Sequence, residues 1–342
     1  MLEKFSKVVR VAFISVYLIF LAGSFVRMTG SGMGCPDWPK CFGYYIPPTS
    51  EETLIWQANT SYEKGMMITK DEVLLSAISD FTSSETYNQN NWEQYTKHDY
   101  AVFNVFHTWT EYINRLVSVL AGFVFLFLMY KSLAFWKTKR SLTLLSFGAF
   151  ALMLFEAWLG KTVVDSNLKP TLITIHMVVG LIIIAILLRT YYLSRPQKTF
   201  KPNSLFTKLL IVSVIFSLVQ IAMGTQVRQF IDEQVKMFGF ENKEYSLMNP
   251  SFKFYFHRSF TIAIVLVNFG MFYLNQTKQL GYNLVNWIVG LIFLEIITGI
   301  LMYYAEFPIG TQALHLMAGA ILFGLQFYLW MQSRGQKQVM ES

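Results

Sequence analysis

The sequence predicts an all-α membrane protein of eight transmembrane helices, arranged as two tandem four-helix bundles with both termini in the cytoplasm. Three observations predict this fold: long apolar runs, basic residues gathered on one side of these runs, and an internal repeat. Of the 342 residues, 54% are hydrophobic and 14% are charged, whereas a soluble domain has about 25% charged residues. With a mean hydropathy of +0.39, the chain is expected to lie mainly in a bilayer.

Eight apolar runs approach the roughly 20 residues that a helix needs to cross a bilayer. They cover about residues 9–28, 107–130, 142–163, 171–193, 208–227, 255–274, 284–303 and 311–331. The first run is not typical of a cleavable signal peptide, because it is long and continues into VRMTGSG without a small-residue cleavage site.

The net charge of +7 could suggest a nucleic-acid partner, but its distribution indicates a membrane topology instead. If the N-terminus lies inside, the inside segments carry fifteen basic residues, from Lys4 to Lys337, and only two acids, Glu3 and Glu341. An excess of Lys and Arg in cytoplasmic segments is the usual pattern of membrane proteins. We therefore expect both termini in the cytoplasm and no nucleic-acid binding.

The first outer loop, about residues 29–106, is long and polar and carries the two cysteines of the chain, Cys35 and Cys41. In an oxidising compartment such a pair favours a disulfide, and two cysteines without a nearby histidine make a poor zinc site. The acidic stretch from Ser50 to Tyr100 is compatible with short helices and shows no chemical motif. His98 within it is expected to be a solvated loop histidine.

Short motifs repeat in the same order in the two halves of the chain. GSFVR (23–27) returns as GTQVR (224–228), YINR (112–115) as YFHR (255–258), EAWLG (156–160) as EIITG (295–299), and IHMVVG (175–180) as LHLMAG (314–319). Three of these pairs are separated by 139 to 143 residues. Since each half has four spans, both halves share one orientation, as in a parallel repeat. We predict domains of residues 1–195, which include the long outer loop, and 196–342.

Every motif falls at the outer end of its span, so a group of polar residues is expected near the outer face of each bundle. The first half supplies Arg27, Glu111, Asn114, Arg115, Glu156 and His176, and the second supplies Arg228, His257, Arg258, Glu295 and His315. Ionisable groups within a span are costly and usually face the bundle interior.

His257 and His315 are expected at matched depth on two helices of one bundle. Facing imidazoles in a bundle can bind a haem iron from both sides, and the neighbouring Arg228 and Arg258 would suit haem propionates. A proton pathway and purely structural polar contacts remain open as alternatives. The first half has His176 but carries Asn114 where the second half has His257, and asparagine is a poor iron ligand. The first cavity therefore suits a substrate, or an iron that must open for chemistry.

Taken together, these motifs resemble those of the haem A synthase family. VRMTGSGMGCPDWPKC (26–41), followed by EYINR, IH, VR, HR and LH across eight spans, covers nearly the whole chain apart from about residues 50–100. The family oxidises one ring methyl group of haem O to a formyl group, which gives haem A for cytochrome oxidase.

The resemblance assigns roles to individual residues. It implies a haem b cofactor with its iron between His257 and His315, a substrate haem at the positions of Asn114 and His176, and a catalytic or proton-handling role for Glu111. The candidates for binding propionates are Arg27, Arg115, Arg228 and Arg258.

Two departures from the family pattern matter. Asn114 replaces an expected histidine, and the second half lacks a further cysteine pair, so thiol chemistry is confined to Cys35 and Cys41, whether structural or redox-active. His107 lies on the same helical face as Glu111 and Asn114 and is a candidate substitute ligand. Seven residues of helix are roughly 10 Å, however, so the substrate haem could sit higher, His107 could act through water, or His176 could bind iron alone. The alternative for His107 is an outer-interface histidine without a functional role.

The resemblance also implies a location and partners. We expect a bacterial inner membrane, in preference to the mitochondrial one, with the haem sites toward the outer face. The expected partners are haem O synthase and cytochrome oxidase assembly factors, and a homo-oligomer is left open. Two other functions remain: a dihaem electron carrier of the quinone-reducing type, which would need a second bis-histidine pair, and a transporter, which would be expected to interrupt its spans with Gly or Pro.

Overall fold

The computed structural model describes residues 1–96, 103–239 and 249–340, so His98 lies outside the described residues. Within these residues, eight helices are long and apolar enough to cross a membrane, which confirms the predicted all-α membrane fold. In chain order they are α1 (Leu2–Met28), α2 (Val105–Ser132), α3 (Arg140–Asp165), α4 (Pro170–Leu193), α5 (Ser204–Phe238), α6 (Phe252–Thr277), α7 (Leu284–Tyr304) and α8 (Thr311–Met340).

Local sequence explains where several helices begin and end. The Asn203 side chain accepts a hydrogen bond from the backbone N–H of Phe206 and so caps the start of α5. Pro170 opens α4, a position where its missing N–H costs nothing. The helix α5 continues beyond the apolar run that ends near residue 227, and in this extension Arg228 pairs with Asp232 one turn later, at 2.7 Å. Hydropathy alone therefore underestimated its length.

The chain forms two compact units. The first, called the membrane unit, comprises Met1–Leu21, Ala121–Ala157 and Pro170–Ser342. The second, called the loop unit, comprises Ala22–Leu120 and Trp158–Lys169.

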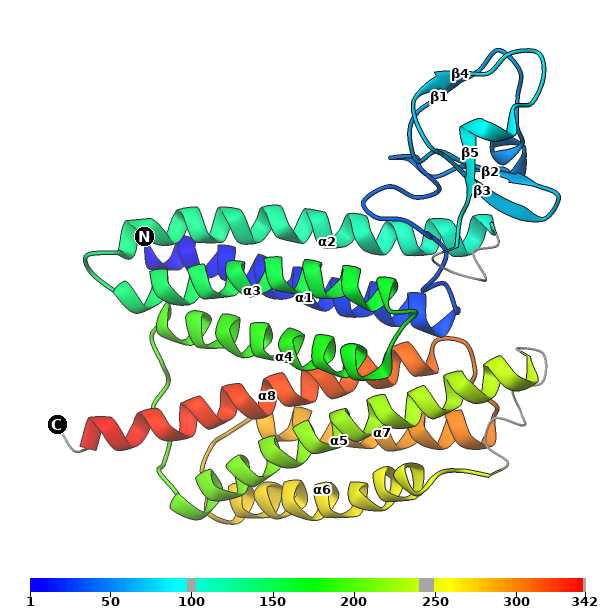
Figure 1. The fold of residues 1–342 in the computed structure, drawn as a ribbon. Helices are drawn as coiled ribbons and strands as arrows, with labels where there is room; N and C mark the ends of the chain where they lie inside the picture. The colour runs from blue at the N-terminus through cyan, green and yellow to red at the C-terminus, as the bar shows by residue number, and fades with distance from the viewer. Residues whose placement is uncertain (97–102, 240–248, 341–342) are drawn as a thin grey trace. The chain divides into compact units, whose positions relative to one another are not determined.

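The membrane unit contains two hydrophobic cores. In one core, α1 to α4 bring together buried residues such as Phe5, Phe125, Leu142 and Leu187, with further contacts from α8. In the other, α5 to α8 pack around Phe206, Met271, Ile288 and Leu329. The last four helices lie side by side (Figure 1), and α4 contacts both α5 and α8.

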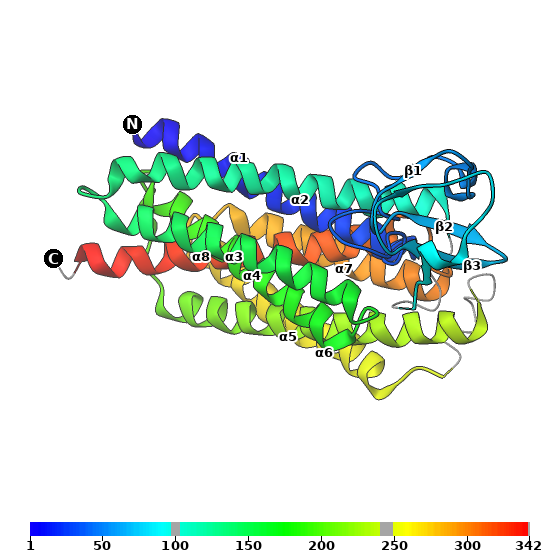
Figure 2. The same cartoon turned by 45° about the horizontal axis from the view of Figure 1, so that its top comes forward.

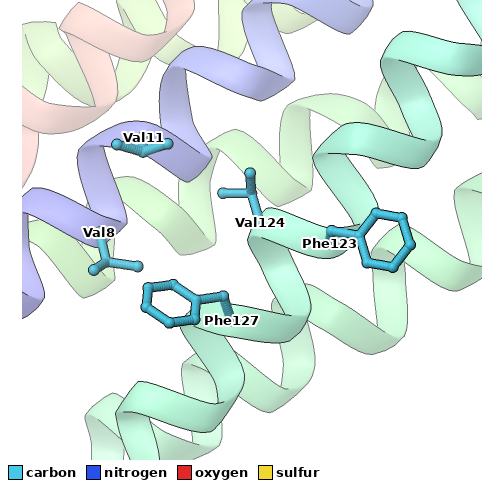
Figure 3. A pocket seen from close by; sticks show the side chains of 5 residues that line it. All are labelled: Val8, Val11, Phe123, Val124 and Phe127. Atoms are coloured by element: carbon cyan, nitrogen blue, oxygen red, sulfur yellow. The ribbon is translucent and has the colours of Figure 1, made fainter.

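The outward faces of these helices are strongly apolar. Large side chains such as Phe123, Ile262 and Trp287 are exposed, as expected of surfaces that lipid covers. A shallow hollow of about 280 Å³ between α1 and α2 is lined only by Val8, Val11, Phe123, Val124 and Phe127 (Figure 3). With no polar group in its lining, this hollow suits a lipid chain and offers nothing for catalysis.

Within the loop unit, the regular structure of residues 50–96 consists mainly of short strands, where the sequence was compatible with short helices. Strands β2 (Met67–Lys70), β3 (Val73–Ala77) and β5 (Trp92–Gln94) form an antiparallel sheet in the order β2-β3-β5. Figure 1 labels all three strands, and Figure 2 shows β2 and β3 from a second direction. A second, two-stranded sheet pairs β1 (Ser61–Tyr62) with β4 (Phe81–Thr82). Two short 3-10 turns, Glu51–Leu54 and Gln89–Asn91, are the helical elements of this stretch.

A two-residue turn explains the hairpin of β2 and β3. Lys70 pairs with Val73, and the intervening Asp71 and Glu72 both have positive φ, 51° and 63°. This is the conformation of a type I′ turn. Asp-Glu is not a usual sequence for such a turn, which is why the acidic composition hid the hairpin.

Gly34 sits where the chain after α1 meets the start of α2. A Cβ atom at this position would lie 2.3 Å from the backbone oxygen of His107 and 2.8 Å from the backbone nitrogen of Thr108. The Thr108 hydroxyl also donates a hydrogen bond to the Gly34 carbonyl, at 2.8 Å. The loop therefore contacts α2 backbone against backbone.

We predict that Gly34→Ala destabilises the protein by about 1–3 kcal/mol, because neither backbone can move without breaking the packing. The measurement is thermal unfolding in detergent, followed by circular dichroism. Gly122→Ala within α2 is the control: a Cβ there meets nothing within 4 Å, and alanine favours the helix. A Gly34→Ala midpoint equal to or above the wild-type midpoint would contradict the prediction.

Candidate functional site

Cys35 and Cys41 form the predicted disulfide. Both are almost completely buried, in a small core that also contains Phe42, Leu54 and Phe103. The disulfide closes a seven-residue loop, CPDWPKC, which lies against α2 within the loop unit.

Arg115 of α2 binds this loop through its main chain. Its Nη1 donates hydrogen bonds to the carbonyls of Asp37 (2.8 Å) and Lys40 (3.1 Å). Its Nη2 donates to the carbonyl of Cys35 (3.3 Å) and to Glu111 Oε1 (2.5 Å). These four bonds use both N–H groups of each terminal nitrogen, so Arg115 could bind a propionate through these nitrogens only by releasing the disulfide loop.

Glu111 is 3% exposed and contacts the same loop. One carboxylate oxygen accepts the Arg115 bond, and the other accepts the backbone N–H of Cys35 at 2.9 Å. Glu111 and Arg115 are one helical turn apart, so their side chains lie on one face of α2. The carboxylate nominated from sequence is thus fixed in position by the disulfide loop.

Asp37 is a structural residue that the sequence analysis missed. Its carboxylate accepts the backbone N–H groups of Phe42 (2.6 Å) and Gly43 (2.9 Å), and so closes the turn after Cys41. Burial raises the pKa of Asp37, although these N–H groups and the Arg115 guanidinium favour its ionised form. An Asp within a short Pro-rich loop is the signal that could have revealed it.

His107 and Asn114 have different surroundings in the loop unit. His107 Nδ1 lies 2.9 Å from the hydroxyl of Ser31, which is fully buried. The Oδ1 atom of Asn114 is buried without a hydrogen-bond partner among the described residues, and a Cβ at Gly23 would lie 3.9 Å from it. Asn114 therefore has an unused buried acceptor, whereas the His107 ring already has a protein partner.

The membrane unit brings His257 of α6 and His315 of α8 together. Their ring centres are 6.3 Å apart and their planes are inclined by 70°. Two imidazoles that bind one metal ion through bonds of about 2 Å have ring centres roughly 6 Å apart. The separation of the two ring centres therefore matches that of two imidazoles on one metal ion.

The contacts of the His315 ring nitrogens also suit a metal ligand. His315 Nδ1 lies 2.8 Å from Glu295 Oε2 and 2.9 Å from Thr298 Oγ1, so an Nδ1–H group faces the carboxylate and Nε2 keeps its lone pair for a metal. In the part of the chain that the structure describes, no group of three or more His, Cys, Asp or Glu side chains could hold a metal ion. Two histidines suit an iron whose other four ligands come from a porphyrin.

The first half contains a matching pair. His176 Nδ1 of α4 contacts Glu156 Oε2 of α3, as His315 contacts Glu295 at the equivalent motif positions. The glycines match as well: a Cβ at Gly23 would approach Asn114, and a Cβ at Gly224 would lie 3.2 Å from His257 Cε1. These contacts occur at equivalent positions of the motifs that repeat in the sequence.

The arginines proposed for propionates differ in their contacts. Arg228 donates to Gln312 Oε1 and pairs with Asp232, and the exposed Arg258 lies over the Tyr303 ring at 5.6 Å. Arg27 is half-buried near the end of α1. Arg258 is thus the exposed arginine of these three, and it is adjacent to His257 in the chain.

We predict that Arg115→Gln exposes the disulfide to reductant. Removing one partner of a buried ion pair costs about 3–5 kcal/mol, and here it also removes three bonds to the loop. Since each 1.4 kcal/mol corresponds to about a factor of ten, reduction by dithiothreitol should become at least about tenfold faster, as followed by thiol labelling and mass spectrometry.

Lys161→Gln is the matched control, because it breaks an i,i+4 pair with Asp165 that is largely exposed and contributes little. Equal reduction rates for Arg115→Gln and the wild type would show that the guanidinium does not hold the loop.

Comparison with known proteins identifies the family of this chain. A haem A synthase of Shewanella oneidensis is 23% identical over 369 aligned positions, which cover 96% of this chain and 98% of that protein. A haem A synthase of Alkalihalophilus pseudofirmus is 22% identical, over 93% of each chain. The family COX15-CtaA, described as "Cytochrome oxidase assembly protein", matches residues 6–79 and 75–327. With nearly its whole length matched, the chain belongs to the COX15-CtaA family of cytochrome oxidase assembly proteins.

Proposed function

We propose that this protein is a haem A synthase, which oxidises a ring methyl group of haem O to a formyl group. The observation that carries the proposal is the pair His257 and His315, whose ring centres are 6.3 Å apart in a chain that belongs to this family. The bacterial relatives named haem A synthase align with 96% and 93% of this chain.

His257 and His315 are proposed as the axial ligands of a haem b iron. When bound, this haem would supply one-electron transfer, the usual role of a haem closed by two histidines. The protein positions both rings. Gln220 of α5 donates hydrogen bonds to the His257 carbonyl (3.0 Å) and to Thr261 (2.9 Å), and Glu295 and Thr298 orient His315. Arg228 and Arg258 are proposed to bind the propionates.

The first half is proposed to bind the substrate. His176, oriented by Glu156, would be the ligand of the haem O iron, and the missing second histidine at Asn114 would leave that iron more open than haem b. The conversion of a methyl to a formyl group adds one oxygen atom and removes four electrons, so it requires an external oxygen source and an external oxidant in each of two two-electron steps, to the alcohol and then to the hydrated aldehyde, which loses water. Glu111 is proposed to accept protons released in these steps. Its place beside Arg115 and the Cys35 N–H gives this carboxylate a fixed position.

The protein is a multi-pass membrane protein, and we propose the bacterial inner membrane as its location. The basic residues between spans support cytoplasmic termini and haem sites toward the outer face. Haem O synthase and cytochrome oxidase assembly factors are the proposed partners. The electron-carrier alternative is less well supported, because Asn114 leaves the first half without a second bis-histidine pair.

We predict that Gly224→Val displaces the His257 ring and removes most of the haem that co-purifies with the protein. A Cβ alone would already lie 3.2 Å from His257 Cε1, and the valine methyl groups would come closer. The haem content per protein is measured by the pyridine haemochrome method. Gly270→Val, at an α6 position where a Cβ meets nothing within 4 Å, should keep its haem; equal loss in both variants would contradict the prediction.

The test of the function is mass spectrometry of haems extracted from protein produced with and without a co-expressed haem O synthase. We expect haem B in both preparations, and haem A or its alcohol precursor only with the synthase. Glu111→Gln should retain haem B and form neither product. His257→Ala and His315→Ala should each lose the bound haem B. Haem B alone in the wild type under both conditions would favour an electron carrier, and a colourless protein would favour a transporter.

A further inference from the structure

The two histidines proposed to bind haem b do not have equivalent surroundings. His315 Nδ1 has two oxygen neighbours, Glu295 Oε2 at 2.8 Å and Thr298 Oγ1 at 2.9 Å. His257 Nδ1 is buried and has no hydrogen-bond partner among the described residues. The Nδ1 atom of His315 therefore has a carboxylate and a hydroxyl beside it, whereas the Nδ1 atom of His257 has neither.

Both neighbours of His315 come from one face of α7. Glu295 and Thr298 are three residues apart, so they lie one above the other on the helix. The Thr298 hydroxyl lies 2.8 Å from the carbonyl of Leu294 and 3.1 Å from that of Glu295. Because a hydroxyl has a single hydrogen, donation to a carbonyl leaves the Thr298 oxygen to accept from Nδ1–H together with the carboxylate.

The surroundings of Glu295 strengthen this effect. The second carboxylate oxygen, Oε1, is buried without a hydrogen-bond partner among the residues described. It lies beside Gly319, where a Cβ would come within 3.5 Å. The hydrogen bond with His315 is therefore the principal polar contact of a carboxylate in apolar surroundings, where electrostatic interactions are stronger than in water.

The first half provides a natural comparison. Glu156 contacts His176 Nδ1 as Glu295 contacts His315. At the motif position of Thr298, however, EAWLG has Leu159, which has no polar group. A hydroxyl beside the histidine is thus a feature of the second half.

We infer that Glu295 and Thr298 are positioning residues that make His315 the more electron-donating axial ligand and thereby lower the reduction potential of the haem b iron. A carboxylate on the far nitrogen raises the basicity of a metal-bound imidazole, and a stronger donor stabilises the ferric state. Hydrogen bonding beyond the axial ligand is one of the means by which a protein sets a haem potential. The inference rests on the proposed function, because it needs haem b at His257 and His315.

The test is a spectroelectrochemical titration of the haem in purified full-length protein, produced without haem O synthase. Glu295→Gln keeps an acceptor for Nδ1–H but removes the charge. Its reduction equilibrium should shift toward the ferrous form by at least about tenfold, which is about 59 mV for a one-electron couple. Thr298→Val keeps the side-chain volume and removes one acceptor, so it should shift in the same direction by less.

Glu156→Gln is the matched control, since it makes the same change beside the other histidine and should leave the haem b potential unaltered. A low-spin ferric electron paramagnetic resonance spectrum in each variant shows that both axial histidines still bind. If Glu295→Gln fails to bind haem, the reduction potential of the Thr298→Val variant tests the inference instead. Haem-loaded variants with the wild-type potential would overturn the inference. The proposed function fails separately, if the wild type holds no haem or if His315→Ala leaves its haem spectrum unchanged.

Discussion

A carboxylate inside an apolar helix bundle needs a protein partner, because no water is available to solvate it. Three glutamates in the membrane-spanning helices meet this constraint. Glu111 pairs with Arg115, Glu156 with His176, and Glu295 with His315. The sites described here depend on these pairs, since each one fixes a side chain that the proposed chemistry uses.

The pairs also explain how one architecture could serve two purposes. Where a glutamate contacts Nδ1 of a histidine, the other ring nitrogen is left for the proposed metal, and the second half is proposed to complete this arrangement with a second histidine. In the first half Asn114 stands at that position, and the neighbouring Glu111 and Arg115 are engaged with the disulfide loop. A buried oxygen of Asn114 without a hydrogen-bond partner among the described residues suits a site that is completed by its substrate.

Much of this structure could be predicted from the sequence. Hydropathy located all eight helices. The repeated motifs predicted that His257, His315, Glu295 and Gly224 lie at one end of a bundle, because a 3.6-residue period and alternating helix directions leave few other arrangements.

Three features could not be predicted. The outer strands depend on a hairpin turn at Asp71 and Glu72 without the usual glycine. The contacts of Arg115 with the disulfide loop depend on main-chain carbonyls, which leave no pattern in a sequence. The contact between Thr298 and His315 depends on the packing of α7 against α8, although the leucine at the equivalent position of the other repeat was a signal.

The measurement that tests the central claim most directly is a cryo-electron microscopy structure of the haem-loaded, full-length protein. The account predicts porphyrin density with its iron between His257 and His315, and Glu295 within hydrogen-bond distance of the far nitrogen of His315. Density for the bound haem at any other pair of ligands, or an empty space between these two histidines in a haem-containing preparation, would contradict it.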